Sequence, residues 1–166
     1  MTALKKIGFI GTGIMGAAMA GHLMDAGFEV SVYNRTKSKA QALIERGAKW
    51  FDTVGECAQG QDVVITIVGY PKDVEEVYLG AGGIIDSARA GAYLVDMTTS
   101  SPILAEKIFA AAQAKNLHAV DAPVTGGDGG AKNATPTILV GGAAGDFNAL
   151  PPVFAAMGKK IVYEDA

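Results

Sequence analysis

Cysteine is almost absent from this 166-residue sequence, and so are long apolar runs and any excess of charge of one sign. A single cysteine, Cys57, excludes an intramolecular disulfide framework, and we expect it to be a small buried hydrophobic residue in a reducing cytoplasm. No apolar run is long enough to span a bilayer, and the first residues show no signal-peptide pattern. The net charge of -3, spread along the chain, predicts no binding to nucleic acid or to a membrane surface.

No cluster of cysteine, histidine or carboxylate residues has the spacing of a metal site, so we expect no bound metal. Hydrophobic residues make up 49% of the chain and charged residues 19%, which is typical of a globular protein of one domain. Glycine, in contrast, is abundant, with 22 residues. The glycines fall between apolar segments, which indicates a fold rich in tight turns.

Short apolar strands alternate with helices along the chain. Expected strands cover residues 7–10, 29–33, 49–51, 62–68, 92–96, 118–121, 137–140 and 160–163; expected helices cover residues 13–26, 38–46, 71–79, 102–115 and 147–157. A proline and acidic residues favour a helix start at residue 71, and Ser101 is an expected N-cap. The alternation predicts an α/β chain with a Rossmann-type, doubly wound, mostly parallel sheet in a single domain over residues 1–166.

A glycine-rich turn follows the first expected strand. The residues match the pattern G-x-G-x-x-G: Gly11, Thr12, Gly13, Ile14, Met15 and Gly16. The first glycine allows the tight turn, the second lets a pyrophosphate approach the backbone, and the third lets the helix pack on the strand. Free N–H groups at the helix start then hold the diphosphate. A turn kept only for packing is the alternative, but the position within the first βαβ unit favours a nicotinamide dinucleotide.

The end of the second expected strand indicates which dinucleotide binds. An NAD site places a carboxylate there, but this chain has Asn34, Arg35 and Thr36. A guanidinium and a hydroxyl suit a 2′-phosphate, which a carboxylate would repel, and Arg35 can also stack on adenine. We therefore expect NADP in preference to NAD. The alternative is that Arg35 is a solvated arginine and that Lys37 and Lys39 continue a basic helix start.

Two further motifs follow in order. Residues 96–102, Asp-Met-Thr-Thr-Ser-Ser-Pro, are similar to D-x-S-T-x-x-P, and residues 121–127, Asp-Ala-Pro-Val-Thr-Gly-Gly, are similar to D-A-P-V-S-G-G. Together with residues 8–16 and 34–36, they resemble the N-terminal domain of the β-hydroxyacid dehydrogenases. This family includes 3-hydroxyisobutyrate dehydrogenase and is related to 6-phosphogluconate dehydrogenase. The resemblance covers nearly the whole chain.

The resemblance implies roles for further residues. The backbone of Tyr70 and Pro71 would line the cofactor, and Thr99 would lie near the nicotinamide ribose. A substrate carboxylate would be bound by residues 125–127, namely Thr125, Gly126 and Gly127. The implied reaction is hydride transfer between the cofactor and a small 3-hydroxy acid or the matching semialdehyde. The chain departs from the family at Thr125, which is usually serine, and at residues 134–137, where Ala-Thr-Pro-Thr replaces G-T-L-T.

The family's catalytic lysine lies on a helix that follows this domain, in a K-x-x-N pattern, and moves the proton as hydride is transferred. The sequence ends at Ala166, so we expect no catalytic residue in this chain and no helical catalytic and dimerisation domain. We interpret Lys132, Lys159 and Lys160 as solvated lysines. The alternative function is a non-catalytic NADP(H)-binding module without turnover.

Without that second domain, we expect exposed apolar surface near Phe154, Met157 and Val162, which would allow a homo-oligomer.

Other ionisable residues favour structural interpretations. Asp96 and Asp121 resemble an acid/base pair at strand ends, but hydrogen bonding to nearby N–H groups is the preferred interpretation. His22 lies among Met and Ala in the first expected helix, which favours packing or surface exposure. His118 begins a strand and has no partner pattern.

Overall fold

The computed structural model describes residues 4–68, 70–98, 102–125, 137–142, 150–158 and 160–165. The strands in this part of the chain are β1 (Lys6–Ile10), β2 (Glu29–Tyr33), β3 (Lys49–Trp50), β4 (Val63–Thr66), β5 (Tyr93–Asp96), β6 (His118–Asp121), β7 (Val124–Thr125), β8 (Thr137–Gly142) and β9 (Lys160–Asp165). The helices are α1 (Ile14–Asp25), the 3₁₀ helix η1 (Lys37–Ala40), α2 (Gln41–Glu45), α3 (Val54–Ala58), α4 (Pro71–Leu79), α5 (Ile84–Ser87), α6 (Pro102–Ala114) and α8 (Pro151–Met157).

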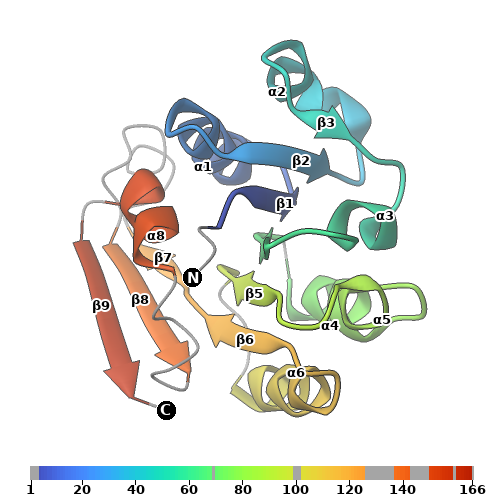
Figure 1. Cartoon of the computed structure of the whole chain (residues 1–166), viewed down its shortest axis with the longest axis vertical. Helices are drawn as coiled ribbons and strands as arrows, with labels where there is room; N and C mark the ends of the chain where they lie inside the picture. Colours follow the sequence, from blue (N-terminus) through green and yellow to red (C-terminus); the bar gives the residue numbers. More distant parts are fainter. Residues whose placement is uncertain are drawn as a thin grey trace.

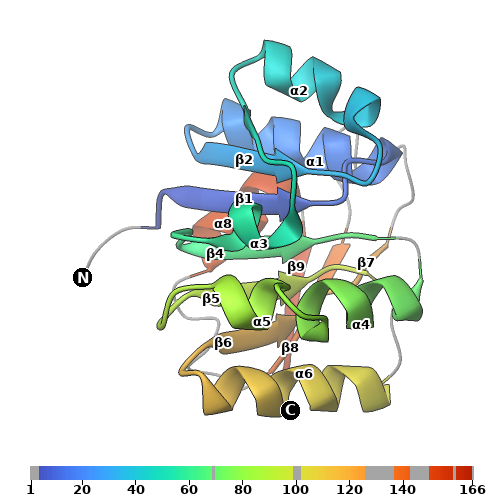
Figure 2. The ribbon, with the colours of Figure 1, turned by 90° about the vertical axis from the view of Figure 1, so that its right-hand side faces the viewer.

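The strands form one sheet in which β3, β2, β1, β4, β5 and β6 are neighbours in that order and all parallel. Figure 2 shows β2, β1, β4, β5 and β6 one below another. Beyond β6 the direction changes, because β8 runs antiparallel to β6 and β7, and β9 pairs in parallel with β8. The order of the six parallel strands is that of a doubly wound dinucleotide-binding fold.

Helices cover both faces of the parallel sheet, as Figure 1 shows. One core joins the strands to α1, α2 and α8, through buried residues such as Met19, Leu43 and Phe154. The other core joins the opposite face to α3, α4, α5 and α6, through buried residues such as Tyr78 and Ile108. The parallel strands are therefore buried on both sides, which explains why three of the four residues of β4, Val63 to Ile65, are apolar.

The α/β Rossmann-type sheet predicted from the sequence is confirmed, and most element bounds agree within two residues. Among the described residues, three short elements were missed, namely α3, α5 and β7. They span only two to five residues each, which is too short for a helical or alternating pattern to appear. The expected helix over residues 38–46 is instead a 3₁₀ turn followed by one α-helical turn. The predicted N-cap Ser101 lies outside the described residues.

The predicted strand over residues 62–68 is too long, since β4 ends at Thr66. The N–H of Ile67 still donates to the carbonyl of Ile10 at 3.0 Å, whereas the N–H of Val68 donates to the Thr98 hydroxyl at 2.9 Å. Both Ile67 and Val68 line a cavity, so their apolar side chains have a role besides packing in the sheet.

The expected exposure of apolar residues near the end of the chain is wrong for two of the three. Phe154 and Met157 are fully buried, and Val162 is half-buried. Helix α8 packs its apolar side into the core shared with α1 and the sheet, so these residues are already covered within the chain. Within the described residues, no helix is long and apolar enough to cross a membrane.

Candidate functional site

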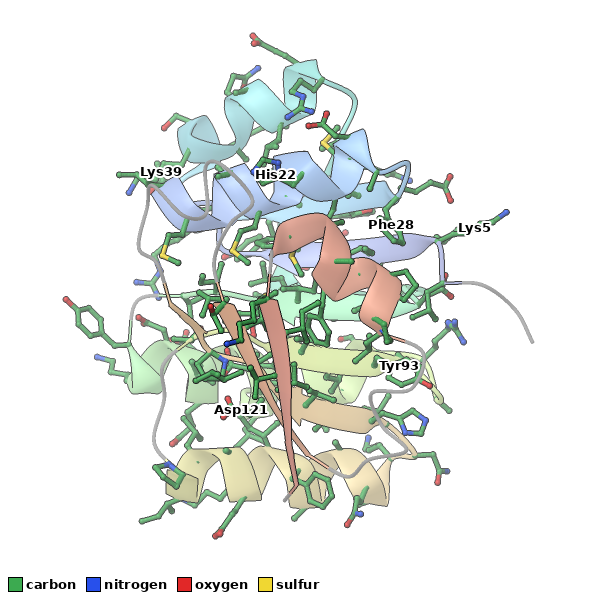
Figure 3. All side chains as sticks on the ribbon, turned by 90° about the vertical axis from the view of Figure 1, so that its left-hand side faces the viewer. Lys5, His22, Phe28, Lys39, Tyr93 and Asp121 are labelled. Carbon is green, nitrogen blue, oxygen red and sulfur yellow. The ribbon has the colours of Figure 1, made fainter. Side chains whose placement is uncertain are left out.

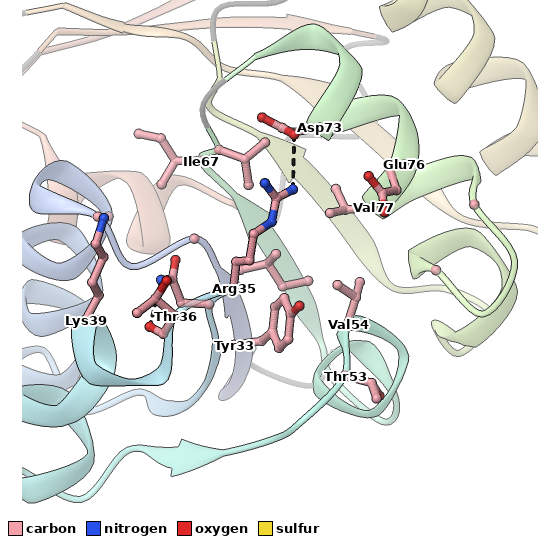
Figure 4. Close-up of a pocket in the computed structure, with 18 of the residues that line it drawn as sticks. Tyr33, Arg35, Thr36, Lys39, Thr53, Val54, Ile67, Asp73, Glu76 and Val77 are labelled. Carbon is pink, nitrogen blue, oxygen red and sulfur yellow. Dashed lines mark hydrogen bonds and ion pairs between the residues drawn. The ribbon is translucent and has the colours of Figure 1, made fainter.

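The direction of winding reverses between β1 and β4, because β1 connects to β2 on one side and β4 to β5 on the other. The strands of the parallel sheet all end at one edge, which we call the carboxyl edge. Open α/β sheets bind ligands at this edge, at the point of reversal. A cavity of about 1000 Å³ opens there (Figure 4). Among its lining residues are nine predicted cofactor-binding residues: Gly11, Gly13, Ile14, Met15, Gly16, Asn34, Arg35, Thr36 and Tyr70.

Two glycines of the turn after β1 are required by close backbone contacts. Gly11 has a φ of +102°, and a Cβ there would lie 2.0 Å from the carbonyl oxygen of Ile67. A Cβ at Gly16 would lie 1.9 Å from the carbonyl oxygen of Gly11. The turn and the start of α1 are thus pressed against each other and against the end of β4.

Gly13 has a different environment. A Cβ built on it would meet no heavy atom of the described chain within 4 Å, and its φ of −66° suits any residue. Nothing in the packing of the described residues requires glycine there. Besides the preference of N-cap positions for glycine, a ligand lying close to this backbone would require the missing side chain.

Helix α1 begins at this turn without a side-chain cap. Gly13 is the N-cap and makes no side-chain hydrogen bond, and the first turn contains no acidic residue. The first N–H groups of an α-helix have no partner within the helix, and the helix dipole makes this end positive. The start of α1 lines the cavity, so it offers hydrogen-bond donors to an anion there.

Asn34 connects the turn to the end of β2. Its side-chain oxygen accepts a hydrogen bond from the N–H of Thr12 at 2.9 Å, and its amide donates to the carbonyl of Thr36 at 2.9 Å. The Asn34 side chain therefore holds the turn in place with both its oxygen and its amide group. The Thr12 hydroxyl is buried and has no hydrogen-bond partner in the described part of the chain.

Arg35 extends from the end of β2 across the cavity to α4 (Figure 4). Its guanidinium forms an ion pair with the Asp73 carboxylate, with 3.1 Å between Nη2 and Oδ1. The Arg35 side chain is 76% exposed, while that of Asp73 is 16% exposed. The guanidinium predicted to bind a 2′-phosphate lines the cavity, but it has an acidic partner that sequence reasoning did not identify.

The start of α4 forms another wall. The N–H of Tyr70 donates to Oδ2 of Asp73 at 3.1 Å, so this carboxylate caps the helix and also binds Arg35. The Tyr70 side chain is 73% exposed, and Pro71 is the first residue of the helix. Thr99, which the resemblance places near the nicotinamide ribose, lies outside the described residues.

Sequence reasoning also missed the far wall of the cavity, which comes from segments distant in sequence. This wall includes Tyr33, Asp52, Val54, Val77 and Gly82. Only the glycines over residues 80–83 were a visible signal, since glycine is common where backbone lies near a ligand. Tyr33 and Val77 lie in β2 and α4, which were predicted, but nothing in the sequence indicated that they line a cavity. Asp52 follows β3, and Val54 begins α3, which was not predicted.

A buried polar network underlies the carboxyl edge between β4, β5 and α4. The Thr66 hydroxyl lies 2.8 Å from the Tyr78 hydroxyl and donates to Oδ1 of Asp96 at 3.0 Å. The same Asp96 oxygen accepts a hydrogen bond from the N–H of Thr98 at 3.0 Å. Asp96 therefore has the structural hydrogen bonds that the sequence analysis preferred over a catalytic role.

Asp121 lies beside Asp96, because their strands pair in register at these two residues. Burial and the negative charge of Asp96 raise the pKa of Asp121 to about 6. Burial raises the pKa of Tyr78 well above its ordinary value, and the charges of Asp96 and Asp121 raise it further. Two carboxyl groups that repel each other when ionised therefore lie at the carboxyl edge, and one of them, Asp121, begins the predicted substrate motif.

The substrate motif is only partly described. Thr125 lies in β7 and pairs with Thr137 of β8, while Gly126 and Gly127 lie outside the described residues, so their binding of a carboxylate stays a prediction. The lysines Lys132 and Lys159 also lie outside them. Lys160 begins β9 and is exposed, as expected.

The two histidines and the cysteine lie away from the cavity. His118, for which the sequence predicted no partner, stacks on Tyr93 with 4.7 Å between ring centroids. His22 is half-buried in α1 and does not line the cavity. Cys57 is fully buried in α3, and burial raises the pKa of its thiol to about 12. The described residues contain no group of three or more potential metal-binding side chains.

Comparison with known proteins agrees with this geometry. Residues 6–164 match the family described as the NAD binding domain of 6-phosphogluconate dehydrogenase. An uncharacterized oxidoreductase of Bacillus subtilis is 55% identical over 160 residues, which cover 96% of this chain and 56% of the relative. The chain thus spans about half the length of the curated relatives it matches.

Solved structures show the same fold. A 3-hydroxyisobutyrate dehydrogenase of Mycobacterium tuberculosis, solved with L-serine, superposes with a TM-score of 0.92 at 31% identity, covering 98% of this chain and 55% of that one. A protein named Psf3, solved in complex with NADP+ and 2-OPP, superposes with a TM-score of 0.91 at 27% identity, covering 96% of this chain and 56% of that one.

Proposed function

Because this chain belongs to the family of NAD(P)-binding domains found in 6-phosphogluconate dehydrogenase and 3-hydroxyisobutyrate dehydrogenase, we propose that it binds NADP(H) for an oxidoreductase acting on a small 3-hydroxy acid or its semialdehyde. The observation that carries the proposal is the cavity at the sheet's point of reversal. One side of this cavity is an uncapped helix start, and the other carries an exposed arginine where an NAD site has a carboxylate.

The residues present fit a dinucleotide diphosphate. The open space at Gly13 lets an anion approach the backbone, and the uncapped N–H groups of Ile14 and Met15 would donate hydrogen bonds to it. The close contact between Gly11 and Gly16 holds this helix start rigidly against the sheet. When bound, the nicotinamide ring supplies or accepts a hydride.

The choice between the two dinucleotides lies at the end of β2. Arg35, Thr36 and Lys39 line the cavity here, and β2 is followed by no carboxylate. A guanidinium can bind a phosphate through two parallel hydrogen bonds, and a lysine adds a positive charge. These residues favour the 2′-phosphate of NADP(H) over the free ribose hydroxyls of NAD(H).

The proposal for the substrate and the proton donor rests on the family resemblance. The resemblance of residues 121–127 to D-A-P-V-S-G-G supports binding of a substrate carboxylate by Thr125, Gly126 and Gly127. We place the group that moves the proton outside residues 1–166, in the half of the relatives' length that this chain does not match. The chain by itself would therefore bind cofactor with little or no turnover.

A titration of the purified chain with NADPH and with NADH, followed by nicotinamide fluorescence, tests the cofactor assignment. We expect tighter binding of NADPH, and we expect Arg35→Ala to weaken NADPH binding about tenfold by removing a charge-assisted hydrogen bond to phosphate. Binding of NADH should change much less. The control variant Arg46→Ala removes an arginine of another ion pair outside the cavity and should leave both affinities unchanged.

Equal or weaker binding of NADPH than of NADH by the unaltered chain would overturn the assignment. A second assay, in which NADPH and small semialdehydes are added to the chain alone, tests the position of the proton donor. Robust turnover there would contradict a proton donor outside these residues.

A further inference from the structure

We propose that Asp73 sets how strongly this site prefers a 2′-phosphorylated dinucleotide, by competing with that phosphate for the guanidinium of Arg35. This inference rests on the proposed function and adds a specificity-determining residue to it. It starts from the ion pair that crosses the cavity in Figure 4.

The two partners are held very differently. The Asp73 side chain is 16% exposed, and its Oδ2 accepts the N–H of Tyr70, so the carboxylate is fixed at the start of α4. The Arg35 side chain is 76% exposed, and its ion pair with Asp73 is the contact that directs it across the cavity. A bound phosphate would therefore have to draw the more exposed partner, Arg35, away from the carboxylate held at the helix start.

The charges around the cavity make this competition significant. Its lining in the described residues includes two cations, Arg35 and Lys39, and three carboxylates, Asp52, Asp73 and Glu76. A phosphate arriving at this site meets a guanidinium that is already neutralised by one of these acids. Like charges repel and opposite charges attract over several ångströms even near a protein surface, so removing the charge of Asp73 should favour the phosphate.

The test is the ratio of the NADH and NADPH dissociation constants for the variant Asp73→Asn. An asparagine oxygen can still accept the N–H of Tyr70, so the helix start is preserved while the negative charge is lost. We expect NADPH to bind about threefold to tenfold more tightly and NADH to change by less than about twofold. A merely structural role for Asp73 would shift both dissociation constants together.

Glu76→Gln is the matched control. Glu76 lies one turn later on α4, lines the same cavity and is exposed, but Asp73 is the carboxylate that the Arg35 guanidinium contacts. The Glu76→Gln substitution removes one negative charge from the same wall of the cavity, as Asp73→Asn does. We expect a change in the ratio clearly smaller than that of Asp73→Asn; an equal change would show a general charge effect and would overturn the specific role of the ion pair.

The double variant Arg35→Ala with Asp73→Asn separates this inference from the proposed function. If Asp73 acts through Arg35, its substitution should no longer raise the NADPH preference once the guanidinium is gone. If Arg35→Ala alone leaves the ratio unchanged, the NADP assignment itself fails. If Arg35→Ala lowers the NADPH preference but Asp73→Asn does not raise it, only the inference about Asp73 fails.

Discussion

The two edges of the parallel sheet differ in whether their polar groups have partners within the chain. At the edge where the strands begin, which we call the amino edge, Asp62 accepts the backbone N–H groups of Lys5 and Lys6, both at 2.9 Å, and forms an ion pair with Arg89. At the carboxyl edge, a helix begins without a side-chain cap beside a cavity, and Asp121 lies against the negative charge of Asp96. Figure 3 shows Lys5 at one edge and Asp121 toward the other.

This contrast teaches where the chain uses its polar groups for folding and where it leaves them for a ligand. In βαβ units, helix starts face the carboxyl ends of the strands, so free N–H groups and positive dipoles gather at one edge only. At the other edge, the N–H groups of Lys5 and Lys6 are already bonded to Asp62. Its carboxylate is satisfied by the chain itself, which stabilises the fold.

The largest expected effect comes from comparing substitutions at two glycines of the same turn. Gly11→Ala should destabilise the chain by about 3 kcal/mol or more, because its Cβ would collide with the carbonyl of Ile67 and its φ is positive. Gly13→Ala should cost less than about 1 kcal/mol, since its Cβ meets open space. Urea unfolding measures both.

The same pair should separate folding from binding. We expect Gly13→Ala to weaken NADPH and NADH alike by about tenfold or more, because a side chain there blocks the diphosphate. A Gly13→Ala chain that folds normally and binds both dinucleotides normally would show that the cavity at this turn is not the cofactor site.

The next test is at the amino edge, with Asp62→Asn. Burial alone would raise the pKa of Asp62, but hydrogen bonds from Lys6 and Lys5 and the charge of Arg89 outweigh it and lower the pKa below its ordinary value. The stabilisation is therefore present above about pH 4 and is lost as the pH falls through the lowered value. We expect Asp62→Asn to cost about 1 to 3 kcal/mol at neutral pH and less in acid.

The measurement is the difference in unfolding free energy between the chain and the variant from pH 3 to pH 7, with Asp52→Asn as an exposed control. A difference that does not grow as the pH rises would contradict the role of the ionised carboxylate.

The smallest effect is expected at the carboxyl edge, with Asp121→Asn, and it has the opposite sign. Burial and Asp96 raise the pKa of Asp121 to about 6, so the folded chain holds this proton more tightly than the unfolded chain. Its ionisation therefore reduces stability as the pH rises from about 4 to about 6. We expect Asp121→Asn to match the unaltered chain near pH 4 and to be about 1 kcal/mol more stable at pH 7.

The same unfolding series measures it. If Asp121→Asn loses stability between pH 4 and pH 7 as fast as the unaltered chain does, ionisation of Asp121 does not destabilise the fold, and the prediction is wrong.

Much of this site was predictable because its signals are local. The alternation of strands and helices predicted the parallel sheet, and the glycine pattern between residues 11 and 16 predicted the turn at its edge. The nine predicted cofactor residues that line the cavity come from three short segments. The short elements α3, α5 and β7 escaped prediction, because two to five residues carry no measurable period.

The sequence by itself determined the fold class, the glycine turn and the absence of a carboxylate after the second strand. Only the tertiary structure decided which polar side chains meet: Asp73 pairs with Arg35, 38 residues away in sequence, and Thr66 donates to Asp96, 30 residues away. It also buried Phe154 and Met157, which the sequence analysis had expected to be exposed. The reason is physical. Periodicity and turn chemistry act between neighbours in the chain, whereas ion pairs and burial depend on which strands the topology places side by side.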